Sequence, residues 1–242
     1  MKITKFITKT INRLPKGYVF TYDDFMEEVK KKEAIIKALN RMAAAGKITK
    51  LSKGKYYKAK DTVFGNLGPD QYQMVKDLLE DENAKPIGYL TGSSVFNQFG
   101  LTSQLSNTIQ IGRNNPRPQL KRDRYTIKFV QQKNNITKDN IYLLQLLDSI
   151  RFIKKIPDAS IPLAVKRLRQ LINDLEQKDI ATLVRLSLRY PPSSRALLGA
   201  ILEDLGKYEH LHPIEKSLNP ITQYDFAKAD HVLDNTAKWN IK

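Results

Sequence analysis

Residues 34–58 read AIIKALNRMAAAGKITKLSKGKYYK, and this stretch decides the N-terminal fold. Its first half repeats apolar residues at helical spacing, which predicts a helix over about residues 31–45 that ends at Gly46. The face of this helix that we expect to be buried holds Ile35, Ala38, Leu39 and Met42. The second half has two β-prone runs, 48–51 and 56–59, separated by a glycine-containing loop, and it predicts a β-hairpin.

Two further helices are predicted upstream of this stretch. Residues 1–14 carry Ile and Leu at helical spacing until a proline ends the pattern. Thr21 followed by Asp24 resembles a capping box and predicts a short helix over residues 22–29. Three helices and a hairpin within residues 1–60 follow the order of a winged helix-turn-helix, a fold that binds double-stranded DNA. A small helical cap with a β-ribbon is the alternative that the same order permits.

The positive charge of the chain is concentrated in the same segment. Of a formal net charge of +16, residues 1–60 carry +11, from 16 Lys and Arg against 5 Asp and Glu. Residues 61–135 carry only +2 and residues 136–242 only +3. A basic excess confined to one segment indicates a polyanionic partner for that segment, either nucleic acid or an anionic membrane surface.

The predicted helix over residues 31–45 has the two faces that a recognition helix needs. Arg and Asn pair bidentately with guanine and adenine in the major groove, so Arg41 and Asn40 are the predicted base-reading residues. Lys30 and Lys37 lie on nearly the same line at helical spacing, and we expect them to contact phosphates. A solvated helix face is the alternative interpretation of these charges.

The predicted hairpin carries Lys53 and Lys55 on either side of Gly54. In a wing, these lysines are expected to lie along the DNA backbone or minor groove and to add salt-dependent affinity. An ordinary turn with solubilising lysines is the alternative. A stripe of cations on the first predicted helix either contacts phosphates as well or forms the outer face of a surface helix: Lys2, Lys5, Lys9 and Arg13.

A second group of cations lies in a proline-broken segment of the middle of the chain. Its members are Arg113, Arg117, Lys121, Arg122 and Arg124. The prolines argue against an amphipathic membrane helix, which would need an apolar face opposite the charges. The group is interpreted as an auxiliary nucleic-acid surface or, alternatively, as a flexible exposed loop.

The whole chain is predicted to be an α+β protein, predominantly helical, with three domains. These are a winged helix-turn-helix over 1–60, a small α/β module over 69–135 and a helical C-terminal domain over 136–242 that ends in an irregular tail from residue 208. Residues 61–68 are predicted to be a linker. The further predicted elements are helices near 70–81 and 93–99, strands at 108–111 and 125–130, and four amphipathic helices between 137 and 205.

Several chemistries are disfavoured by what the sequence lacks. The chain has no cysteine, so disulfides, thiolate metal sites and cysteine nucleophiles are excluded. His210 and His212 form a pair without an evident third ligand, and we expect no metal and no cofactor. We also expect no enzymatic activity. Because no run of about 18 apolar residues and no signal peptide is readable, the expected location is the cytoplasm.

The order of several segments resembles one family. LPKGYVFTYDDF (14–25) and the stretch at 34–58 resemble the N-terminal winged helix of the AbiE-type antitoxins of type IV toxin–antitoxin systems. GYLTGSSVFNQFGLTSQLSNTIQI (88–111) is similar to the segment that follows the winged helix in those proteins. YPPSSRALLGAILEDLG (190–206) is similar to a C-terminal block of regulators with the same architecture.

This resemblance implies a repressor that binds its own promoter and takes part in abortive infection, a form of phage defence. It further implies an antitoxin that neutralises a nucleotidyltransferase-like toxin without a stable complex. No antitoxic residue can be matched to a position in this chain. A nucleic-acid-processing enzyme that uses the winged helix to position its substrate, a transcription factor without a toxin, and a protein-binding adaptor are the alternatives.

Overall fold

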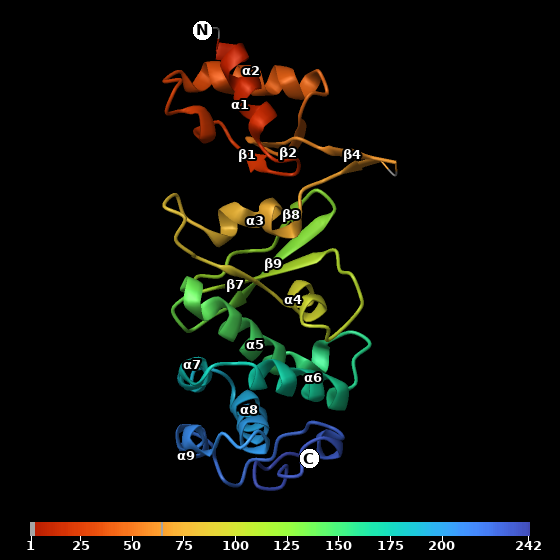
Figure 1. Ribbon diagram of the computed structural model, residues 1–242, viewed down its shortest axis with the longest axis vertical. Coiled ribbons are helices and arrows are strands. Elements are labelled where there is room, and N and C mark those ends of the chain that lie inside the picture. The colour runs from red at the N-terminus through yellow and green to blue at the C-terminus, as the bar shows by residue number, and fades with distance from the viewer. Residues whose placement is uncertain (1–2, 64) are drawn as a thin grey trace. The chain divides into compact units, whose positions relative to one another are not determined.

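The computed structural model describes residues 3–63 and 65–242 and has the α+β fold that the sequence predicts (Figure 1). The chain divides into two compact units. The first comprises the residues up to Asp77 together with Leu120–Tyr125, and the second comprises Leu78–Gln119 and Thr126–Lys242. This division differs from the three predicted domains, because the middle of the chain contributes to both units and shares one apolar core with the C-terminal helices.

Helices α1 (Ile3–Arg13) and α2 (Lys32–Ala44) confirm two of the three helices predicted for the first unit. The helix predicted over 22–29 is wrong in extent, because only the 3-10 turn η1 (Asp23–Phe25) forms there. The predicted capping contact is present: the Thr21 amide donates to the Asp24 carboxylate at 2.7 Å. A segment this short supplies too few hydrogen bonds to offset the cost of helix nucleation.

The strands of the first unit form an antiparallel sheet in the order β1-β3-β2. β2 (Thr49–Ser52) and β3 (Lys55–Tyr57) confirm the predicted hairpin, and β1 (Val19–Phe20) was not predicted because two residues carry no periodicity. The sheet closes over α1 and α2 through a shared core. That core consists of Ile7, Ile11, Phe20, Phe25, Ile35, Ala38, Leu39, Met42, Ile48 and Tyr56.

The linker predicted over 61–68 is instead a second hairpin, made of β4 (Lys60–Thr62) and β5 (Gly65–Leu67). The Thr62 hydroxyl donates to the Gly65 carbonyl at 2.6 Å, and Gly65 has a φ of +104° that other residues rarely adopt. Helix α3 (Gln71–Leu79) follows, as predicted.

The second unit is built on a sheet and a layer of helices. β7 (Thr108–Arg113) and β9 (Tyr125–Gln131) confirm the two predicted strands and pair in parallel, while β6 (Tyr89–Thr91) pairs antiparallel with β7. The strand β8 (Leu120–Arg122) lies between β7 and β9 in the sequence and belongs to the first unit. Helix α4 (Ser93–Gln98) packs on β6 and β7.

Four long helices follow where the sequence predicts them: α5 (Ile141–Arg151), α6 (Ile161–Asn173), α7 (Gln177–Ser187) and α8 (Pro192–Asp204). α5 packs on β6, and both α7 and α8 pack on α5 (Figure 1). Their leucines and isoleucines fill the larger of the two cores. No helix within residues 3–63 and 65–242 is both long and apolar enough to cross a membrane.

The segment after α8 is mostly irregular, as the sequence predicts, but it packs closely on the second unit. It contains the short helix α9 (His212–Lys216) and folds back on α8. Trp239 is 2% exposed, and its indole Nε1 donates to a Glu203 carboxylate oxygen at 2.7 Å. Gly199 leaves the room for this ring, since a Cβ there would lie 2.1 Å from the Trp239 ring.

A polar cluster sits inside the core of the second unit. The carboxylate of Asp148 on α5 accepts hydrogen bonds from Tyr89 (2.7 Å), Thr91 (2.8 Å) and Tyr190 (3.0 Å). Gln132 donates to both tyrosine hydroxyls. Burial raises the pKa of Asp148, while the three hydroxyl donors act in the opposite direction. The cluster therefore ties β6, α5 and the end of β9 together from within.

Candidate nucleic-acid interface

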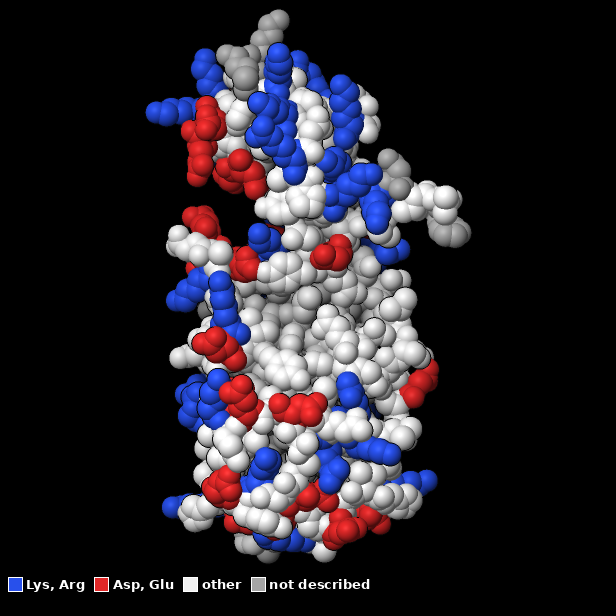
Figure 2. All heavy atoms as spheres, viewed as in Figure 1, with Lys and Arg blue, Asp and Glu red and all other residues white. Residues whose placement is uncertain are grey.

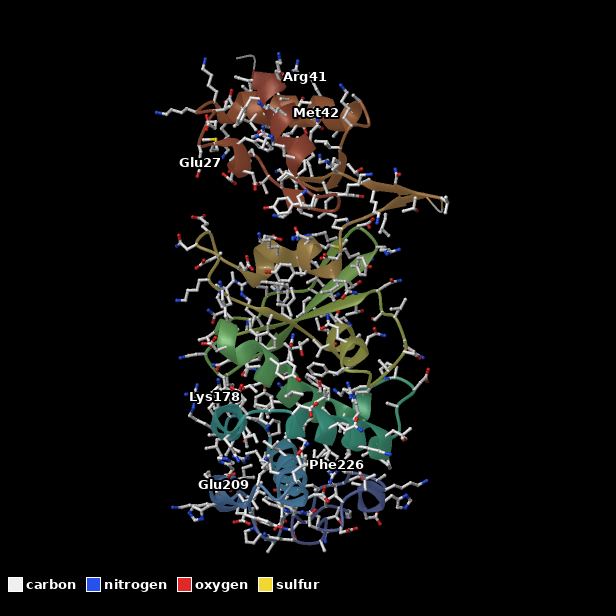
Figure 3. The ribbon with its side chains drawn as sticks, in the orientation of Figure 1. Glu27, Arg41, Met42, Lys178, Glu209 and Phe226 are labelled. Carbon is white, nitrogen blue, oxygen red and sulfur yellow. The ribbon has the colours of Figure 1, made fainter. Side chains whose placement is uncertain are left out.

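The face of α2 that points away from the core carries the polar residues that the sequence singles out. The four predicted apolar residues are buried as expected: Ile35, Ala38, Leu39 and Met42. Lys37, Asn40 and Arg41 are exposed on the remaining face. Figure 3 labels Arg41 and Met42, which are neighbours in the chain and differ in burial. This arrangement follows from the helical period, which separates an apolar stripe from a polar one.

An open groove of about 460 Å³ runs between the start of α1 and the exposed face of α2. It is lined by Ile3, Thr4, Ala34, Lys37, Asn40 and Arg41. The Arg41 guanidinium donates to the Thr4 hydroxyl at 3.4 Å, a long contact that leaves most of its donors available. Three of the predicted contact residues thus share one concave surface, which α1 completes.

Asn40 has a fixed partner that sequence reasoning missed. The hydroxyl of Tyr56 on β3 donates to Asn40 Oδ1 at 2.6 Å. Tyr56 is only 2% exposed, and its ring stacks on Phe20 of β1. Burial raises the pKa of Tyr56, so its hydroxyl stays protonated and able to donate. The only signal in the sequence is an aromatic residue on a predicted strand, and it does not reveal which side chain the hydroxyl meets.

Lys30 does not lie where the sequence predicts. It is exposed, but it precedes the first turn of α2, which begins at Lys32. Lys31 has a non-helical backbone with φ −105° and ψ 81°, so helical spacing does not carry from Lys30 to Lys37. Lys32 in turn lies over the Tyr22 ring, 4.3 Å from its centroid.

The two lysines of the β2–β3 hairpin differ in their contacts. Lys53 is exposed beside Gly54, whose φ of +76° makes the turn. Lys55 is half-buried and forms an ion pair with Asp77 of α3 at 3.1 Å. The sequence predicts Lys55 as a second wing contact for DNA, but the Asp77 carboxylate holds its ammonium group instead.

The predicted second basic group is not one surface. Arg122 is buried and donates to both carboxylate oxygens of Asp77, at 2.7 and 3.1 Å, and to the Met74 carbonyl. Its prediction as an exposed nucleic-acid contact is wrong, because these groups use its guanidinium inside the first unit. Arg113 is half-buried at the end of β7. The other three residues are exposed: Arg117, Lys121 and Arg124.

Charge is unevenly distributed over the first unit. Lys and Arg side chains gather over α1 and α2, whereas acidic side chains lie at one flank (Figure 2). These acidic residues belong to the segment around η1: Asp23, Asp24, Glu27 and Glu28. Glu27, labelled in Figure 3, lies at this flank and apart from Arg41. A polyanion that approaches the α1–α2 groove therefore meets a positive field.

The described residues include no group of side chains that could bind a metal ion. No three His, Asp or Glu side chains within residues 3–63 and 65–242 are grouped so that they could hold a metal ion. His210 of the predicted histidine pair contacts the Gln177 side chain at 3.1 Å.

Comparisons with known proteins bear on family and fold. Residues 6–183 match the model of DUF6088, a family of unknown function. No curated protein matches the chain. A crystal structure of the RV2827C protein from Mycobacterium tuberculosis is similar with a TM-score of 0.59 and 16% sequence identity, over 93% of this chain and 84% of that one. This likeness concerns the fold alone. Since the family model covers most of its length, the chain belongs to the DUF6088 family.

Proposed function

We propose that the first unit is a winged helix-turn-helix that binds double-stranded DNA, with α2 as its recognition helix. The observation that carries this proposal is the groove between α1 and α2, where Lys37, Asn40 and Arg41 lie exposed together. Arg and Asn side chains match the major-groove edges of guanine and adenine, and Lys matches phosphate. A helix that presents all three from one face has the chemistry of a base-reading element.

The β2–β3 hairpin serves as the wing in this proposal. Its exposed Lys53 stands beside the glycine of the turn, where it can contact a phosphate backbone without constraint from other protein groups. Such a contact adds affinity for any DNA sequence, because the phosphates carry no base information. Lys55 has a different role, since its ion pair with Asp77 holds β3 against α3.

In the cell, this activity makes the protein a repressor that binds its own promoter. The antitoxin role rests on the resemblance to AbiE-type antitoxins, and it belongs to the second unit in this proposal. The second unit has a continuous apolar core with a polar cluster at its centre, which suits it to present a surface of fixed shape. Its target would be a nucleotidyltransferase-like toxin encoded beside this protein.

A gel-shift titration against the DNA upstream of the gene tests DNA binding by the first unit. Arg41→Ala should reduce the preference for this DNA over random duplex by about 5- to 150-fold, the range of a bidentate base contact. Lys53→Ala should weaken binding to both duplexes alike and make the salt dependence shallower by about one unit. Lys178→Ala, which removes an exposed lysine of the second unit, is the matched control.

Each outcome of this titration has a defined meaning. Binding that falls steeply with salt and is unchanged in the Lys178→Ala variant supports the proposal. Wild-type protein that does not bind duplex DNA at low salt would overturn it. If Arg41→Ala and Lys53→Ala have the same effect on both duplexes, α2 is not the base-reading helix.

A further inference from the structure

The contact between Tyr56 and Asn40 joins a buried residue to an exposed one. Tyr56 lies in the core of the first unit, where its ring stacks on Phe20 and its hydroxyl meets the exposed Asn40 side chain. Asn40 lines the open groove. The hydrogen bond of 2.6 Å crosses from the sheet to the helix, because Tyr56 belongs to β3 and Asn40 to α2.

This hydrogen bond constrains the amide of Asn40 in a particular way. It uses one of the two lone pairs of Oδ1 and leaves the second lone pair unoccupied. Within the part of the chain that the structure describes, Asn40 Nδ2 has no hydrogen-bond partner. One acceptor site and two donor hydrogens thus remain for a ligand in the groove, and the plane of the amide is held by the tyrosine.

An adenine in the major groove offers the complement of that pattern. Its N7 accepts a hydrogen bond and its N6 amino group donates one, so a single amide can satisfy both. An amide that is already oriented loses less rotational freedom on binding than a free one. Guanine presents two acceptors at the same edge and leaves the Oδ1 acceptor without a donor.

We propose that Tyr56 is a positioning residue that holds the Asn40 amide in the orientation needed to read one adenine in the major groove of the operator. This inference rests on the proposed DNA-binding function of α2. It assigns base selectivity at one position to a residue that does not itself contact DNA. Tyr56→Phe is the informative substitution, because it removes the hydroxyl and keeps the ring that stacks on Phe20.

The experiment begins by selecting the preferred duplex from a random library with the full-length wild-type protein. Binding is then measured for that duplex and for versions with each base pair replaced, at one fixed salt concentration. The proteins compared are wild type, Tyr56→Phe, Asn40→Ala and the double variant. Tyr57→Phe is the matched control, because consecutive residues of a strand face opposite sides and Tyr57 therefore points away from Asn40.

The expected result is a loss of selectivity at one A·T pair. Asn40→Ala should lower the preference for that pair by about 5- to 150-fold, and Tyr56→Phe by about 3- to 10-fold. In the Asn40→Ala background, Tyr56→Phe should have no further effect on selectivity. The affinity for random duplex and the salt dependence should stay as in wild type, and the Tyr57→Phe variant should behave as wild type throughout.

Two failures of this experiment are distinguishable. If wild-type protein selects no duplex, the proposed DNA-binding function fails, and the inference fails with it. If wild-type protein selects a duplex but Tyr56→Phe keeps full selectivity at every position, the positioning role alone is wrong. A thermal unfolding curve for Tyr56→Phe separates lost selectivity from lost folding, because a misfolded first unit would weaken binding to random duplex as well.

Discussion

Some cations of the first unit are bound to a carboxylate of the protein, and others are exposed. Lys55 and Arg122 both meet Asp77, which lies on α3 between them. Lys37 and Lys53 are exposed. A cation that already has a carboxylate partner gains little from a phosphate, because it would lose that partner on contact. The cations available to a polyanion are therefore fewer than the net charge of the segment suggests.

The first prediction concerns the buried cation of the second basic group. Arg122→Ala should lower the free energy of unfolding by about 1.5–3 kcal/mol, because it removes a buried guanidinium together with its hydrogen bonds to the Asp77 carboxylate and the Met74 carbonyl. Arg117→Ala is the control from the same group. It should change the free energy of unfolding by less than about 0.5 kcal/mol, as substitutions at exposed positions usually do. Urea unfolding followed by circular dichroism measures both. Equal effects would show that the contacts of Arg122 contribute nothing to stability.

The second prediction concerns pH and the same carboxylate. Burial raises the pKa of Asp77, but Arg122 and Lys55 outweigh burial and hold the pKa below its ordinary value. A carboxyl group whose pKa is lower in the folded state stabilises the protein above its unfolded pKa of about 3.9 and loses this contribution as the pH falls through the folded value.

Asp77→Asn should therefore cost stability at neutral pH. The difference in free energy of unfolding between wild type and variant should shrink as the pH falls below about 4. Urea unfolding between pH 3 and 7 at constant ionic strength measures this difference. A difference that does not change with pH would contradict the role given to the two cations.

At the scale of elements, the shortest ones depend most on their partners. β1 has two residues and exists because Val19 and Phe20 pair with Tyr57 and Tyr56 of β3. The tail after α8 also depends on contacts with another element. The Trp239 ring packs against Gly199, and its indole donates a hydrogen bond to Glu203. Burial of the indole removes a large apolar surface from water and is expected to contribute most to holding the tail.

The third prediction tests how the tail is held. Gly199→Ala places a Cβ 2.1 Å from the Trp239 ring, so the indole must move. Because the chain has a single tryptophan, its fluorescence reports on this ring alone. The emission should shift to longer wavelength as the ring becomes solvated, and unfolding should become easier by about 1–3 kcal/mol. Ser193→Ala on the same helix is the control and should leave the emission unchanged.

At the scale of the whole molecule, the two proposed activities belong to different units. The first unit includes Leu120–Tyr125, which comes from the middle of the chain. A deletion of residues 1–60 would therefore remove the groove but leave Leu120–Tyr125 without most of the unit to which it belongs. Point substitutions in the groove separate the activities more cleanly, since Lys37 and Arg41 are exposed.

The fourth prediction tests this separation. The double variant Lys37→Glu/Arg41→Glu should fail to repress the promoter, because it places two negative charges where the phosphates approach. The same variant should still protect cells that express the neighbouring toxin, because the second unit is unchanged. A promoter-fusion assay and a toxin-rescue assay in the same strain measure the two activities. Loss of both by a variant that unfolds like wild type would contradict independent activities and favour a transcription factor without a toxin.

The sequence by itself determined the elements that are long and regular. α1, α2 and the four helices α5 to α8 were predictable, because their apolar stripes repeat over several turns. The strands β7 and β9 were predictable for the same reason, at a period of two. For the groove, the division between buried Leu39 and exposed Lys37, Asn40 and Arg41 follows from helical spacing alone.

Only the tertiary structure decided which polar groups find each other. Nothing in the sequence indicates that Arg122 contacts Asp77, which is 45 residues away. Nor does the sequence show that Arg122 is buried while Arg117 is exposed. The Tyr56 hydroxyl meets Asn40 only because β3 packs against α2. Local periodicity reports which side of an element faces the core, but it carries no information on which distant side chain lies opposite. The charge of a residue is thus readable from the sequence, and its availability to a ligand is decided by the fold.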